Sequence, residues 1–310
     1  MAYRTTEFAH HGSLACPGSG FHFLSGTLSP SALKPGWYDP MNHSNMATQV
    51  TLVALYGKKK SELATFIVHC QKAVADAFGS AFTPYAVDQV HATIIGLERL
   101  SSSRFDNGNF ARFRGRSVAM DFAGFLEYLR GCGGFPLEIQ VGGFQDRDYP
   151  FTSRKSRPYE RSFSIQGDKV VVMGWPVRGE PVSMSVLQST PETLIQESRI
   201  YPMTLDMLRH GAQGFGILHG YHRGFTDVDN DLFFRLGLID QESTSLGSTS
   251  SLEMRMREHM SQATPLIIEV ALDDVFVAAY DDDTLPVART NAWSVTDRRV
   301  DGKFISELYS

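Results

Sequence analysis

The stretch DQVHATIIGL, Asp88 to Leu97, predicts a strand with a histidine and a threonine inside it. Side chains alternate between the two faces of a strand, so His91 and Thr93 lie on the same face. The apolar residues around them predict that the strand is buried in a sheet. An imidazole beside a hydroxyl at this place indicates a functional surface on one side of that sheet.

Regular elements precede and follow this strand. Residues 49–57 form a β-rich run, and residues 61–78 carry apolar side chains at helical spacing, so the chain opens with a strand, a helix and a strand. Further on, the pattern predicts a helix over 118–130, strands over 135–144, 162–166, 169–177 and 214–225, a helix over 191–209 broken by Pro202, and a final pair of strands within 265–280.

This order of elements predicts an α+β fold, with helices packed on a largely antiparallel sheet. Residues 1–47 show no sustained hydrophobic period, and this predicts an irregular N-terminal arm. The main domain is expected over 48–285, with surface insertions near 145–165 and 240–262, and residues 286–310 are expected to form a polar C-terminal tail.

Charge and cysteine content narrow the classes of partner. The net charge of −5 and the pI near 6.1 argue against duplex nucleic acid and membrane surfaces, because both are anionic. Cys16, Cys70 and Cys132 are odd in number and lack C-x-x-C spacing, so no disulfide framework is expected. Neither a secretory leader pattern nor an apolar run of about 18 residues is present, which predicts a cytoplasmic protein. The pattern leaves its oligomeric state open.

A second histidine repeats the first pattern. In HGYHRG, His219 is followed by a glycine five residues later, as His91 is in HATIIG, and Tyr221 offers a hydroxyl two residues after the histidine. Two neighbouring strands of this kind would bring two imidazoles and two hydroxyls together. A neutral imidazole can then remove a proton while the other, protonated, donates one, because the unperturbed pKa of histidine is about 6.5. No metal or other cofactor is needed for that chemistry.

These residues resemble the 2H phosphoesterase superfamily, which includes the 2'-5' RNA ligase-like proteins and the cyclic phosphodiesterases and is defined by two H-x-T/S motifs. HATIIGL is similar to the first motif in full, and the resemblance covers about residues 48–280. It implies a bilobal sheet with a central cleft, His91 and His219 as the acid–base pair, and Thr93 as a phosphate-binding hydroxyl. The second motif departs from the pattern, because Tyr221 stands where Thr or Ser is expected and His222 is a competing histidine. Tyr221 stays a candidate phosphate-binding residue, because its hydroxyl can still reach a phosphate oxygen.

The resemblance implies a metal-independent phosphodiesterase whose substrate is a small nucleotide or an RNA end. The bond would belong to a 2',3'-cyclic phosphate, a 2'-5' linkage or a cyclic oligonucleotide. The basic insertion between the motifs adds candidate substrate-binding residues, because arginine forks bind phosphate and aromatic rings stack on bases. Together with His222, these candidates are Arg154, Arg157, Tyr159 and Arg161.

Two other hypotheses stay open. The departure at Tyr221 permits a nucleotide-binding module that has lost catalysis. Alternatively, His219 and His222 bind a metal with one of the aspartates of residues 227–231, which makes the protein a metal-dependent hydrolase. That metal site requires a helix or a tight turn at His219, whereas the apolar pattern there predicts a strand.

Overall fold

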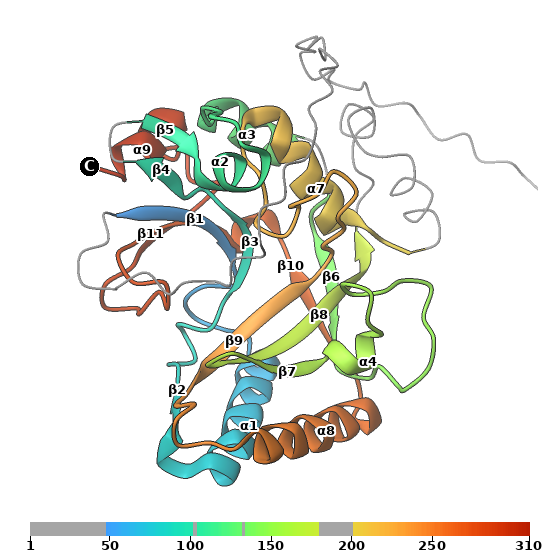
Figure 1. The fold of residues 1–310 in the computed structure, drawn as a ribbon. Coiled ribbons are helices and arrows are strands. Elements are labelled where there is room, and N and C mark those ends of the chain that lie inside the picture. The colour runs from blue at the N-terminus through green and yellow to red at the C-terminus, as the bar shows by residue number, and fades with distance from the viewer. Residues whose placement is uncertain (1–47, 102–103, 132–133, 180–200) are drawn as a thin grey trace, which may run out of the picture. The chain divides into compact units, whose positions relative to one another are not determined.

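The computed structural model of this chain describes residues 48–101, 104–131, 134–179 and 201–310 (Figure 1). The predicted arm over 1–47 and the first part of the predicted helix over 191–209 lie outside the described residues. Pro202 lies two residues before the helix that begins at Thr204. None of the helices in the described ranges is long and apolar enough to cross a membrane.

The predicted antiparallel sheet is confirmed. Every strand pair in the described part of the sheet is antiparallel. In order across the sheet the strands are β10 (Leu266–Val270), β6 (Leu137–Val141), β8 (Lys169–Gly179), β9 (Leu232–Ile239), β3 (Ala92–Gly96), β1 (Gln49–Ala54), β11 (Val275–Tyr280) and β12 (Asn291–Ser294), with β2 (Phe82–Pro84) beside β9 and β7 (Phe163–Gln166) beside β8. A separate hairpin pairs β4 (Arg99–Ser101) with β5 (Arg104–Asn107).

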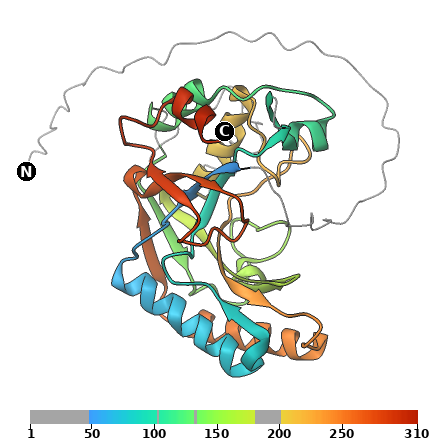
Figure 2. The same cartoon turned by 90° about the vertical axis from the view of Figure 1, so that its left-hand side faces the viewer.

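Helices gather at two ends of this sheet. They are α1 (Ser61–Phe78), α2 (Gly108–Arg114), α3 (Phe122–Gly131), α4 (Pro158–Arg161), α7 (Thr204–Ala212), α8 (Leu246–Gln262) and α9 (Gly302–Glu307). In both views α1 and α8 lie side by side at the lower end, while α2, α3 and α9 lie at the upper end (Figures 1 and 2). The fold is therefore α+β, as the sequence predicts.

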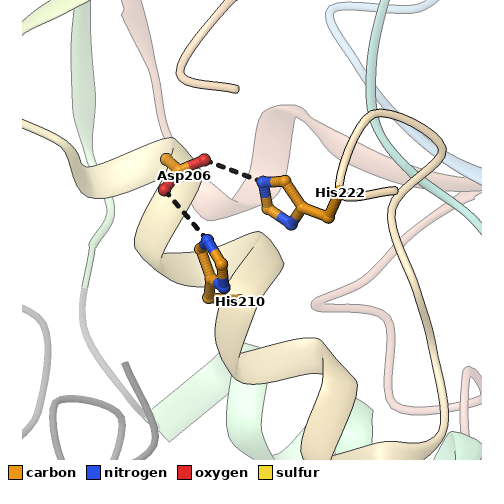
Figure 3. A group of neighbouring side chains, drawn as sticks. All are labelled: Asp206, His210 and His222. Atoms are coloured by element: carbon orange, nitrogen blue, oxygen red, sulfur yellow. Dashed lines mark hydrogen bonds and ion pairs between the residues drawn. The ribbon is translucent and has the colours of Figure 1, made fainter. Parts of the chain in front are cut away.

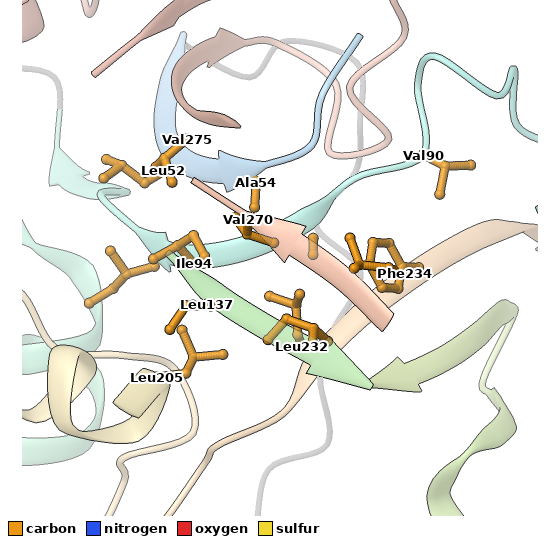
Figure 4. Packing of buried hydrophobic residues seen from close by; sticks show 14 of the residues in the cluster. Leu52, Ala54, Val90, Ile94, Leu137, Leu205, Leu232, Phe234, Val270 and Val275 are labelled. Carbon is orange, nitrogen blue, oxygen red and sulfur yellow. The ribbon is translucent and has the colours of Figure 1, made fainter. Parts of the chain in front are cut away.

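The main hydrophobic core lies on one face of the sheet, which we call the helix face. Alternate strand residues such as Leu52, Ala54 and Phe234 point into it (Figure 4). The apolar side chains of α1, α3, α8 and α9 pack in the same cluster, because each of these helices is apolar along one stripe. The predicted stripe of the first helix is confirmed, since Leu63 and Ile67 are buried in this core.

The opposite face, which we call the loop face, carries Val53, Val171, Met173 and Phe233 and is covered differently. Two smaller clusters lie on it. One is centred on Val53 and the other on Val171 and Met173. The second cluster is covered by Phe144 and Phe151, which come from the loop between β6 and α4. This loop makes up the first part of the predicted insertion near 145–165, whose remainder forms α4 and most of β7.

Two predicted peripheral segments belong to the core. Residues 246–262, expected within a surface insertion, form α8, and Leu252, Met256 and Met260 on one side of it are buried. Residues 286–310, expected to be a polar tail, contain β12 and α9 and bury Ile305 and Tyr309. Both segments are mostly polar, but they carry an apolar side chain every three to four positions. That spacing places the apolar side chains on one face of a helix, which can then be buried.

The strand predicted over 214–225 is wrong. A short 3-10 turn over Gln213–Phe215 is followed by residues without regular structure, and the strand comes later, as β9. Gly216 has φ of 73°, a left-handed conformation that ends the preceding helical turn. The final strands are confirmed as β10 and β11, but β10 pairs with β6 and β11 with β1 and β12, so they are not partners of each other.

Candidate functional site

The first motif lies at the centre of the sheet. His91 immediately precedes β3, and Thr93 lies on it with its side chain half-buried on the loop face. Ala92 pairs with Phe234 of β9, so the antiparallel register places Arg235 opposite His91. The neighbouring strand therefore presents an arginine, not a second histidine, beside the motif.

His91 is held as a neutral base. Its Nδ1 lies 2.7 Å from the carbonyl oxygen of Gln89. Burial lowers the pKa of His91 to about 4, with Arg235 and Lys59 adding to the decrease and the bond to Gln89 opposing it. Arg235 is anchored by Asp283, whose carbonyl oxygen accepts a hydrogen bond at 3.2 Å, and it stays a cation at every physiological pH.

The second histidine lies in the loop before β9. Nε2 of His219 is 2.7 Å from Oδ2 of Asp229, and both side chains are buried. The Tyr221 ring lies 5.6 Å from the His219 ring, centre to centre. Among the described residues, no hydrogen bond or ring contact joins His219 to His91. The two predicted catalytic histidines thus have separate surroundings.

A buried arginine connects these surroundings. The Arg209 side chain, which has an exposed fraction of 0%, donates to the carbonyl oxygens of Thr93 and Ile94 on one side. On the other side it donates to the carbonyl oxygens of Asp229 and Asp231 and forms an ion pair with Asp229. β3 and β9 are paired at a single position, Ala92 with Phe234. Beyond that pair, the Arg209 guanidinium donates the hydrogen bonds that these backbone carbonyls would otherwise accept from a neighbouring strand.

A pocket opens beside this network. Its volume is about 510 Å³, and its lining includes Tyr149, Phe151, Arg154, Lys155, Tyr201 and Tyr221. The Arg154 guanidinium lies 3.4 Å from the centre of the Tyr221 ring and is 3.5 Å from Oδ1 of Asp229. Arg154 and Lys155 have φ of 48° and 68°, a left-handed backbone that non-glycine residues adopt at a cost in free energy.

The other candidate substrate-binding residues have partners elsewhere. Arg161 pairs with Asp231 at 3.3 Å and so supports the network behind the pocket. Arg157 pairs with Asp146 at 2.5 Å and with Glu160 at 2.8 Å. The Tyr159 hydroxyl lies 3.4 Å from a carboxylate oxygen of Glu258 on α8. None of these three side chains lines the pocket.

His222 belongs to a third group of residues, in the protein interior. Its side chain has an exposed fraction of 0%, so it does not reach the pocket. Its Nε2 is 2.8 Å from Oδ1 of Asp206, and Oδ2 of Asp206 is 3.5 Å from Nε2 of His210 (Figure 3). The His210 and His222 rings stack with their centres 4.2 Å apart. The three side chains place their donor atoms within 4.8 Å of one another and have the composition of a metal site.

The sequence prediction for a metal site named only part of this group. The amide of His222 donates to the carbonyl of His219 at 3.0 Å, so the tight turn that the metal hypothesis requires is present. His219, however, pairs with Asp229, and the aspartate beside His222 is Asp206 of α7. Asp206, Arg209 and His210 were not predicted as site residues. Asp206 and His210 could have been recognised from the sequence, because residues four apart in a helical segment lie on the same face of the helix.

The chain was compared with models of known protein families, with curated proteins and with solved structures. No family model matches it. Neither the comparison with curated proteins nor that with solved structures gave a match.

Proposed function

We propose that this chain binds a small nucleotide or a related phosphate ester in the pocket lined by Arg154, Lys155 and Tyr221. The observation that carries the proposal is the composition of that pocket, in which two cationic side chains and four aromatic side chains surround about 510 Å³. Cations bind the phosphate oxygens, and an aromatic ring stacks on the base. A pocket of this size accommodates a mononucleotide or a dinucleotide.

The fold proposed with this function is the bilobal arrangement of the 2H phosphoesterases. One half of the sheet runs from β10 to β9, and the other from β3 to β12. The halves meet at β3 and β9 through the pair Ala92–Phe234 and through Arg209. The histidine motif lies on the strand at this junction, where the resemblance expects the cleft.

The contacts favour a protein that binds the nucleotide but does not hydrolyse it with two histidines. Acid–base cleavage needs one group to accept a proton and another to donate one. His91 is a neutral base, and Arg235 opposite it holds its proton too tightly to act as an acid. His219 is buried against Asp229 and does not line the pocket, whereas Tyr221, whose ring lies 5.6 Å from the His219 ring, does. This arrangement corresponds to a nucleotide-binding module.

The test is calorimetric titration of the full chain with mononucleotides, 2',3'-cyclic nucleotides, 2'-5' oligoadenylates and cyclic dinucleotides. At least one of these ligands is expected to bind with micromolar affinity, and Lys155→Ala and Arg154→Ala are each expected to weaken it at least tenfold. Arg157→Ala is the matched control, because Arg157 lies in the same loop but pairs with Asp146 and Glu160. Equal affinity in wild type and both pocket variants would place the ligand elsewhere, and silence across the panel would refute the proposal.

Hydrolysis of a phosphodiester is the second candidate, favoured by the neutral imidazole of His91 beside the Thr93 hydroxyl. Mass spectrometry of the same mixtures detects it. If His91 is a general base, His91→Ala lowers turnover at least about a hundredfold, whereas the exposed His69→Ala leaves it unchanged. Product formation that survives in His91→Ala would exclude His91 as the catalytic base.

A further inference from the structure

α7 is buried on every side, although four of its nine residues are polar or charged. Thr204, Asp206, Arg209 and His210 are all inside the protein. Buried polar groups require partners, because burying an unpaired charge costs several kcal/mol. Arg209 has its partners in the two half-sheets, as described above. Asp206 and His210, one helical turn apart, face His222 of the 219–222 turn (Figure 3).

We propose that Asp206, His210 and His222 bind a zinc ion. Zinc ligands of this type lie about 2.0 to 2.2 Å from the metal, so two ligands at a tetrahedral angle are roughly 3.4 Å apart. Nε2 of His222 is 2.8 Å from Oδ1 of Asp206, and Nε2 of His210 is 3.5 Å from Oδ2, so each imidazole lies near this separation from one of the two carboxylate oxygens. One carboxylate oxygen and the two imidazole nitrogens all lie within 4.8 Å of one another, and the three donors would move closer together on binding the ion.

The contacts of Asp206 are an independent observation that points to a cation. Its Oδ1 accepts hydrogen bonds from the Asp229 amide and from His222, but its buried Oδ2 has no hydrogen-bond partner among the described residues. Asp229 and Asp231 are each paired with two arginines. Within the part of the chain that the structure describes, Asp206 pairs with no arginine or lysine. A divalent ion beside Oδ2 supplies the charge that arginines supply to the other two aspartates.

The surroundings of His210 fit a metal ligand. Its Nε2 faces Asp206, while its Nδ1 lies 3.2 Å from the side-chain amide nitrogen of Gln213, which donates to it, so Nε2 carries the proton of the neutral ring. Zinc would replace that proton, and the Gln213 amide would then turn so that its oxygen accepts from the Nδ1 N–H group and holds the ring in orientation. The carbonyl oxygen of Asp227 is 3.2 Å from Nε2 of His210 and is a fourth candidate donor atom at the same place. A set of two imidazoles, a carboxylate and a carbonyl has the borderline character that zinc prefers.

The proposed zinc ion is structural, because all three side chains have an exposed fraction of 4% or less and leave no route for a substrate. It joins α7 to the turn that carries Tyr221 and to the segment that carries Asp227. Both of these residues line the pocket. The ion would thus fix one wall of the pocket from behind. The proposal does not rest on the identity of the pocket ligand.

The first experiment measures the metal directly, in the full chain without nucleotide. Protein from zinc-supplemented medium is analysed for metal content, stripped with a chelator in mild denaturant, refolded, and titrated with zinc chloride. One zinc ion per chain is expected, with a rise in Tm on zinc addition and none on magnesium addition. His210→Gln, His222→Gln and Asp206→Asn are each expected to weaken zinc binding at least tenfold. Unchanged zinc binding in these variants would overturn the proposal.

His69→Gln and His259→Gln are the matched controls, because both histidines are exposed on helices. The histidines of residues 1–47 are present in every protein compared and contribute equally to each titration. If the variants do not fold, X-ray absorption of the zinc-bound wild type decides the question without them. Two imidazoles with oxygen ligands support the site, whereas three or more imidazoles, or no bound zinc, refute it. Failure of nucleotide binding changes none of these readouts.

Discussion

Nη1 of Arg209 lies 3.2 Å from Oδ2 of Asp229, and this buried ion pair lies where β3 and β9 diverge. The same guanidinium donates to backbone carbonyls on both strands or their extensions, including Thr93 and Asp231. Asp229 in turn accepts from His219 and pairs with Arg154 of the pocket. One arginine therefore connects the two half-sheets, the second histidine and the pocket.

Removing this arginine is expected to be strongly destabilising. Arg209→Met leaves Asp229 with one arginine fewer and several buried carbonyls without donors, so the free energy of unfolding should fall by about 3 to 5 kcal/mol. Urea denaturation measures the change. Arg289→Met is the control, because Arg289 has an exposed fraction of 56% and surface ion pairs contribute little to stability. A loss below about 1 kcal/mol in Arg209→Met would show that the strands are held together by other contacts.

The stability should depend on pH through His91. Burial lowers the pKa of His91 to about 4, whereas in the unfolded chain it is about 6.5. The unfolded state then binds the proton more readily, so the stabilisation from neutral His91 is complete above pH about 6.5 and decreases as the pH falls toward 4. The free energy of unfolding, measured by urea denaturation at pH 7.5 and 4.5, should therefore fall between these pH values by about 1 to 3 kcal/mol less in His91→Gln than in the wild type. An NMR titration of wild type with a His91 pKa near 6.5 would contradict the prediction.

The left-handed backbone of Lys155 makes a separate prediction. Lys155 is exposed with φ of 68°, so Lys155→Gly should raise the free energy of unfolding by about 0.5 to 1 kcal/mol because glycine adopts this conformation without steric cost. The same variant should bind the nucleotide more weakly, since a pocket cation is lost. Lys58→Gly, at an exposed residue without positive φ, should give no stabilisation. A destabilised Lys155→Gly would mean that its side chain makes contacts that outweigh the strain.

α8 offers a paired test of the corrected core. Met256 is 6% exposed and packs in the main hydrophobic cluster, while Met254 on the same helix is 63% exposed. Met256→Ala should lower the free energy of unfolding by about 2 to 4 kcal/mol, because it leaves a cavity, and Met254→Ala should change it by less than about 0.5 kcal/mol. If both variants changed the free energy of unfolding equally in thermal or urea denaturation, α8 would be a surface insertion and not part of the core.

Much of the fold could be predicted because local apolar patterns reflect local burial. The stripe of α1, the alternation in β6 and the continuous apolar run of β8 are visible in the chain and are present in the structure. The strand predicted over 214–225 failed because Ile217 and Leu218 are buried as loop residues beneath α7, which no local period distinguishes from a strand. β9, which directly follows the aspartates of residues 227–231, was not predicted.

The candidate site depended more on tertiary structure. The sequence by itself determined an α+β chain with an antiparallel sheet, a histidine and a hydroxyl on one strand face, and a basic aromatic loop, because those properties follow from residue spacing. The tertiary structure decided that Arg235 is opposite His91, that His219 bonds to Asp229, and that His222 meets Asp206 and His210. Such pairings join residues far apart in the chain. They are set by strand register and by the placement of helices, and both of these depend on the packing of the whole core.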